Sequence, residues 1–128
     1  MNHQEKIRDI TPRERELLAR LRFRPEVFLG DVSLRNFFHM SSGYQYAMQT
    51  AGLPVVHNLL PDGLSHFTER WYGGEMGTRN WYSMIALHEP DDAEALVCFF
   101  EILDAYLMEL GFAPLPVIES WEQFGENW

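Results

Sequence analysis

The sequence has one cysteine, no long uninterrupted apolar segment and few basic residues after position 35. The lone Cys98 cannot form an internal disulfide, which agrees with a reducing compartment and favours a small core side chain over a reactive thiol. The longest nearly apolar run, ALVCFFEILDAYLMEL, contains Glu101, Asp104 and Glu109, so no membrane span is predicted. The first residues are charged and lack the apolar stretch of a secretory signal, so we expect a cytoplasmic protein.

The sequence also lacks the usual patterns of chemical sites. Five histidines are too dispersed for a known zinc spacing, and the glycine-rich YGGEMG segment lacks the lysine of a phosphate loop. Asp62, His66 and Glu69 share one helical face and could form a metal-dependent hydrolase site. A hydrogen-bonded surface cluster is the favoured interpretation, so we predict a non-enzyme without catalytic residues, metal or cofactor.

The length and composition predict one compact domain. The chain has 128 residues, of which 46% are hydrophobic, enough to fill a single core. We predict a mainly α fold, a bundle of about four to six helices with a core at about residues 11–112. Residues 113–128 should form an irregular C-terminal tail that packs on the core or contacts a partner.

Capping residues and apolar periodicity place the helices. Thr11 precedes a short amphipathic helix, Asp31 or Ser33 can cap a second that ends near Gly52, and a third follows Gly63. Residues 81–88 could be a strand or a helix; helix is favoured because no convincing strand exists to pair with them. Asp91 should cap a central helix that runs to about Leu110.

Three packing details follow from the same patterns. RPEVFLG, residues 24–30, is predicted to be a packed corner between two helices, not a ligand loop. Gly43, inside the second helix, suggests close contact with another helix. The apolar side of the central helix should contact two or more helices through Leu96, Val97, Phe99, Phe100, Ile102, Leu103, Tyr106 and Leu107.

The net charge of −9 is distributed unevenly. Residues 1–35 hold eight basic and six acidic side chains, a net +2, so the remaining 93 residues carry −11. The acidic part should repel nucleic acid and anionic membranes and attract a basic partner. The basic cluster near the N-terminus is interrupted by Glu14 and Glu16, and its arginines are expected to pair with the acidic face of the central helix or with the carbonyl ends of neighbouring helices.

Four segments together resemble a known group of proteins: RPEVFLG, SLRNFFHMSSGYQYAM, LLPDGLSHFTERWYG and NWYSMIALHEPDDAEALVCFFEILDAYL. Their order is similar to that in small bacterial immunity proteins of polymorphic toxin systems, which carry an R-P-x-M-Y-L-G corner, a G-Y helix, an F-x-x-F helix, a tryptophan segment and an F-F-x-L-L-D-x-Y helix. The resemblance covers roughly residues 22–110 and departs at Val27 and Phe28, where methionine and tyrosine are usual. It implies a non-enzymatic inhibitor that binds a cognate toxin inside the producing cell.

We therefore predict a protein–protein interface on the acidic surface, facing a basic toxin or effector domain. An acidic nucleic-acid mimic that inhibits a defence enzyme, and the small metal-dependent hydrolase, stay open as alternatives. The candidate contacts are polar-loop and helix acids, with tail aromatics as possible anchors: Glu75, Asp91, Asp92, Glu94, Glu101, Trp121, Phe124 and Trp128.

Overall fold

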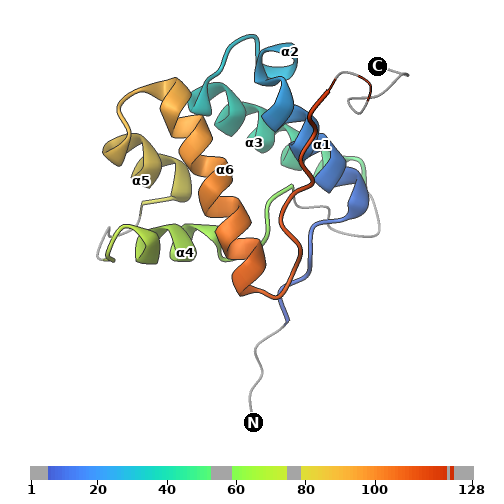
Figure 1. Ribbon diagram of the computed structural model, residues 1–128. Helices are drawn as coiled ribbons and strands as arrows, with labels where there is room; N and C mark the ends of the chain where they lie inside the picture. The colour runs from blue at the N-terminus through green and yellow to red at the C-terminus, as the bar shows by residue number, and fades with distance from the viewer. Residues whose placement is uncertain (1–5, 53–58, 75–78, 121, 123–128) are drawn as a thin grey trace.

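The computed structural model describes residues 6–52, 59–74, 79–120 and 122. Within them the chain forms six helices and no strand, as the predicted mainly α fold requires (Figure 1). Residues 81–88 are helical, which resolves the helix-or-strand ambiguity in favour of helix. The helices are α1 (Pro12–Phe23), α2 (Pro25–Leu29), α3 (Leu34–Thr50), α4 (Leu64–Trp71), α5 (Trp81–His88) and α6 (Asp92–Glu109).

The central helix is α6, which packs against α3, α4 and α5 (Figure 1). Asp91 caps it as predicted: its carboxylate accepts hydrogen bonds from the backbone N–H groups of Ala93 and Glu94 at 3.0 and 3.1 Å. Thr11 and Ser33 cap α1 and α3 in the same way. Asn80 caps α5 by accepting from the Ser83 N–H at 2.8 Å. Polar side chains thus fix where four of the helices begin, and the local sequence predicts the starts at Thr11, Ser33 and Asp91.

Aromatic rings fill the centre of the bundle. Phe37 of α3 and Phe99 of α6 are both fully buried, with ring centroids 4.8 Å apart, and Trp81 of α5 lies 4.9 Å from Phe99. Such contacts stabilise beyond the area they bury. Trp71 of α4, by contrast, is 45% exposed. The core therefore joins α3, α5 and α6 through rings that are distant in sequence.

The RPEVFLG segment is a packed corner, but it is not irregular. Pro25 begins the one-turn helix α2, and Gly30 ends it with a left-handed backbone, φ 80°. Phe28 and Leu29 pack against the core while partly exposed, and the Asn36 side chain donates to the Leu29 carbonyl at 3.0 Å. A single helical turn thus links α1 to α3.

A buried carboxylate holds α1 against α3. Glu14 is fully buried and accepts hydrogen bonds from the Thr11 hydroxyl, from Tyr44 of α3 at 2.5 Å and from Arg13 at 2.9 Å. Burial alone would raise the pKa of Glu14, but these donors together outweigh it and lower the pKa to about 2. The same contact raises the pKa of Tyr44 to about 12, through its burial and the neighbouring Glu14 charge.

A close approach joins the start of α4 to α6. The Tyr106 hydroxyl donates to the Asp62 carbonyl at 2.5 Å, and a Cβ atom at residue 63 would collide with that hydroxyl. Gly63 also has φ 87°, so two constraints require glycine there. Gly43 shows no such constraint: it is exposed, with open space where a Cβ would be, so the predicted close packing at Gly43 is wrong.

The first part of the predicted tail packs on the bundle. Leu115 is buried and its N–H donates to Asp104 at 2.9 Å, while Arg15 donates to the Pro114 carbonyl at 3.2 Å. The segment is irregular, as expected, and runs back along α1 (Figure 1). In the described part of the chain, no helix combines the length and apolar character needed to cross a membrane.

Candidate functional site

The start of α6 uses two of the predicted contact residues for internal bonds. Asp91 is the cap described above, and Asp92 accepts hydrogen bonds from the Ser33 hydroxyl and from the Arg35 N–H, the latter at 3.1 Å. Both acids are exposed, but their carboxylates hold the α6 start and tie it to the start of α3. Asp91 and Asp92 thus hold the start of α6 in place, and with it the exposed side chains that follow along the helix.

Further along α6, four exposed residues form a stripe of alternating acidic and apolar side chains. Steps of three, four and seven residues place them on one side of the helix over roughly 20 Å. Val97 is 51% exposed and Met108 61% exposed. We call this set the α6 stripe: Glu94, Val97, Glu101 and Met108.

In the part of the chain that the structure describes, no cation pairs with either carboxylate of the α6 stripe. Neither Glu94 nor Glu101 forms an ion pair or accepts a side-chain hydrogen bond within the described chain. Both residues are exposed, so both carboxylates face solvent. The stripe therefore presents two uncompensated negative charges about 10 Å apart along the helix axis.

The other acids of α6 are compensated. Asp104 pairs with Arg22 of α1 at 2.7 Å, and Glu109 pairs with Arg70 of α4 at 2.7 Å. The hydrogen bond from Arg70 lowers the pKa of Glu109. The expected pairing of an N-terminal arginine with the acidic face of the central helix is thus confirmed for Arg22. These pairs attach neighbouring elements to α6 and take no part in the stripe.

Val97 corrects one prediction. It was assigned to the buried side of the central helix, but no described element covers it. Its position three residues after Glu94 and four before Glu101 places it on the same side of the helix as these acids and between them along the axis, and that spacing was the signal that could have found it. No exposed position was predicted for Met108. The same kind of spacing places it on this side of the helix, since it lies seven residues after Glu101.

Other predicted contacts lie outside the part of the chain that the structure describes. Glu75 falls in the segment 75–78, and the tail aromatics Trp121, Phe124 and Trp128 fall beyond residue 120. They remain predictions. Of the candidate acids that are described, only Glu94 and Glu101 combine exposure with the absence of an internal partner.

The alternative metal site does not assemble. No group of three or more histidine, cysteine, aspartate or glutamate side chains in the described ranges is arranged to hold a metal ion. His66 and Asp62 are exposed, and Glu69 is partly buried. Asp62, His66 and Glu69 share a face in sequence but do not converge in space.

Cys98, also on α6, is partly buried with its sulfur 3.3 Å from the Tyr72 hydroxyl. Burial is the main cause that raises the pKa of its thiol, so the nucleophilic thiolate is disfavoured. Tyr72 in turn stacks on His88, with ring centroids 3.9 Å apart. This trio packs the junction of α4, α5 and α6, as expected for a structural cysteine.

Comparisons with family models, curated proteins and solved structures gave no match. The resemblance to immunity proteins therefore stays a prediction.

Proposed function

We propose that this chain is a non-enzymatic immunity protein that binds and neutralises a cognate toxin domain in the bacterial cytoplasm, with the α6 stripe as its contact surface. The partner would be basic where it meets Glu94 and Glu101. The observation that carries the proposal is that these two acids are exposed and have no partner among the described residues, while the other acids of α6 are paired or bonded internally.

Unpaired charges suit recognition because a partner meets them without breaking an internal bond. Complementary charge also accelerates encounter and makes the association rate fall with added salt. A toxin domain with a basic cleft for nucleic acid or nucleotides would fit this field. Glu94 and Glu101 would then act mainly on the association rate.

Apolar side chains between the acids would supply affinity. Much of the binding energy of an interface comes from apolar residues that lose contact with water at its centre and are surrounded by a polar rim. Val97 and Met108 are more than half exposed in the isolated chain. Covering them would remove apolar area from water.

The stripe is also held rigidly. The opposite side of α6 is buried, with Phe99, Ile102, Leu103 and Leu107 fully shielded from solvent. A helix fixed in this way presents its exposed side chains with little further ordering on binding.

Co-expression with the toxin encoded beside this gene tests the proposal. Growth should be rescued by the wild-type chain and by Glu109→Gln, whose carboxylate is paired, but weakened by the double variant Glu94→Gln/Glu101→Gln. The association rate of the purified double variant should fall at least tenfold at low salt, against less than threefold for Glu109→Gln.

The possible outcomes distinguish the immunity function of the protein from its use of the α6 stripe as the contact surface. If the toxin kills equally well with and without this protein, the immunity function is wrong. Protection that the double variant retains in full would refute the α6 stripe and leave the role standing. Inhibition of a DNA-binding defence enzyme that added DNA reverses would support the nucleic-acid mimic instead.

A further inference from the structure

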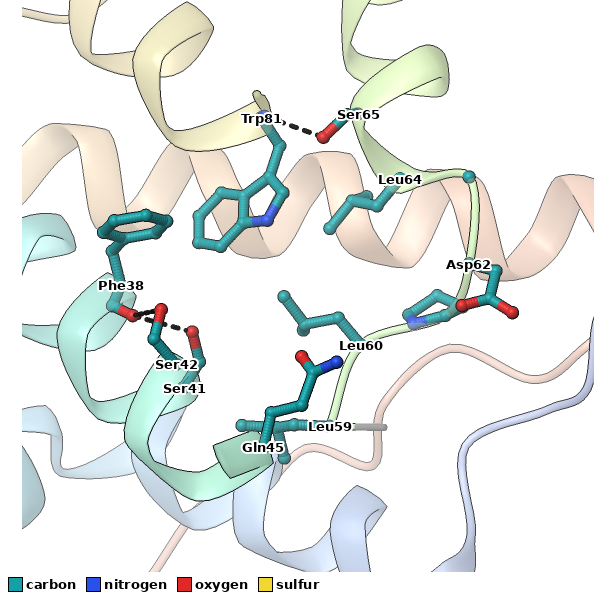
Figure 2. A pocket seen from close by; sticks show the side chains of 12 residues that line it. Phe38, Ser41, Ser42, Gln45, Leu59, Leu60, Asp62, Leu64, Ser65 and Trp81 are labelled. Atoms are coloured by element: carbon teal, nitrogen blue, oxygen red, sulfur yellow. Dashed lines mark hydrogen bonds between the residues drawn. The ribbon is translucent and has the colours of Figure 1, made fainter. Parts of the chain in front are cut away.

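A separate pocket lies between α3 and the starts of α4 and α5. It has a volume of about 330 Å³, and residues 59–63 complete its wall. Figure 2 shows α6 passing behind the pocket, and no residue of α6 is among the described lining residues. A volume of this size is at the lower end of the range for pockets that hold small organic molecules. The pocket is therefore large enough for a small ligand and separate from the α6 stripe.

The indole N–H of Trp81 is a hydrogen-bond donor without a partner among the described residues. Trp81 is partly buried, and its ring lies against Phe37 and Phe99, with centroids 6.1 and 4.9 Å away. Its backbone N–H donates to the Ser65 hydroxyl at 3.0 Å, but no described group accepts from its indole N–H. In Figure 2 the indole nitrogen lies on the edge of the ring that faces Leu60, in the pocket. Buried indole N–H groups usually have a partner, so this donor suits an acceptor on a ligand.

Side chains of α3 supply hydrogen-bond acceptors on another side of the pocket. The hydroxyls of Ser41 and Ser42 both donate to the Phe38 carbonyl at 2.9 Å, which uses the single hydrogen of each. Their remaining lone pairs can only accept. The Gln45 amide points into the same space in Figure 2 and forms no hydrogen bond within the described chain. This side therefore favours a ligand that carries a donor.

The space between these polar groups is neutral and otherwise apolar. Asp62 is the one charged residue among the described lining residues, and Figure 2 shows its carboxylate pointing away from the space between Trp81 and Gln45. Leu60 and Leu64 point into that space. An ion that entered would lose its hydration without meeting an opposite charge. The pocket therefore favours a neutral molecule with an apolar body.

From these features we infer that the pocket binds a small neutral amide, a molecule such as a lactam that carries a carbonyl acceptor and an N–H donor on a compact ring. Its carbonyl oxygen accepts from the Trp81 indole, and its N–H donates to the hydroxyl of Ser41 or Ser42. Its ring lies against Leu60 and Leu64. No residue of the α6 stripe takes part, so failure of this proposal would leave the co-expression result untouched.

Titration of the isotope-labelled protein with small ring compounds tests the ligand class by NMR. The cyclic amide 2-pyridone should shift the indole N–H signal of Trp81 and the amide signals of Gln45 and Leu60. Benzylammonium and benzoate, which carry a single charge of either sign on a ring, should bind at least tenfold more weakly. No shifts with 2-pyridone at millimolar concentrations, or equal binding of either charged ring, would overturn the proposal.

Two variants test the two hydrogen bonds separately, with the Leu60 amide signal as the readout. Trp81→Phe removes the indole N–H but keeps a ring, so it should weaken the binding of 2-pyridone and of N-methyl-2-pyridone alike, each at least fivefold. The methylated compound has no N–H to donate, so Ser41→Ala/Ser42→Ala should weaken 2-pyridone at least threefold and leave N-methyl-2-pyridone unchanged. The serine variant decides alone if Trp81→Phe does not fold.

Trp71→Phe is the matched control for the indole. Trp71 is exposed and lies outside the described lining of the pocket, so its loss should leave the binding of both compounds unchanged. Equal weakening in Trp71→Phe and Trp81→Phe would refute the location. Equal weakening of both compounds in the serine variant would refute the donor to α3 and with it the amide as the ligand class.

Discussion

The surface around α1 and the α6 stripe use acidic side chains in different ways. Around α1, Glu14 is buried under three donors, and the Arg22–Asp104 pair joins α1 to α6. On the α6 stripe, Glu94 and Glu101 have no such partner in the described chain. The difference shows that position relative to hydrogen-bond donors and arginines, and not residue type, separates acids that stabilise this fold from acids available to a partner.

Removal of the buried acid should have the largest effect. Glu14→Ala leaves the hydroxyls of Thr11 and Tyr44 without their acceptor and should lower the free energy of unfolding by about 3 kcal/mol. Urea denaturation measures the change. Glu101→Ala is the matched control on the α6 stripe, and a loss of equal size there would erase the contrast between the two regions.

The same contrast should depend on pH. The pKa of Glu14 falls from 4.5 to about 2 on folding, so its stabilisation is complete above about pH 4.5 and is lost as the pH falls toward 2. At neutral pH this linkage amounts to about 3 kcal/mol. The stability difference between wild type and Glu14→Ala should therefore shrink between pH 4.5 and 2; a constant difference would contradict the lowered pKa.

The partly buried ion pair between Arg22 and Asp104 should matter less. Arg22→Ala removes the partner of Asp104 and a cation that lies 5.5 Å from the Phe100 ring centre, and should cost about 1 kcal/mol. Thermal unfolding should show this shift and none for Arg35→Ala, whose exposed side chain has no partner in the described chain. Equal shifts in the two variants would mean that Arg22 acts only through the net charge of the protein.

The smallest effect on stability should come from the α6 stripe. Glu101→Gln removes a charge that has no partner among the described residues, so the free energy of unfolding should change by less than about 0.5 kcal/mol. Its association rate with the toxin should still fall. Calorimetry and binding kinetics on one preparation check both, and a clear loss of stability would place Glu101 among the structural acids.

Much of the helical architecture was predictable because its signals are local. Thr11, Ser33 and Asp91 cap the helices that the sequence places after them, and 81–88 is helical as expected. The single turn α2 was missed because five residues carry no periodicity, and its stability comes from packing. The buried state of Glu14 could not be predicted because Tyr44, one of its partners, lies thirty residues away.

The candidate site was predicted only in part. The acidic face of the central helix gave Glu94 and Glu101, but sequence alone could not tell them from Asp104 and Glu109, which meet arginines on α1 and α4. Val97 was placed in the core because an apolar residue on a helix with a broad apolar side is usually buried. Whether another element covers Val97 depends on the tertiary packing of the helices.

The contact between Gly63 and Tyr106 has an evolutionary consequence. Where an aromatic hydroxyl stands at position 106, natural selection should keep position 63 as glycine, since any side chain there collides with it. A lineage could escape only through a smaller residue at 106, which would open space beside 63 while also removing the bond to the Asp62 carbonyl. The two positions should therefore change together among descendants of this gene.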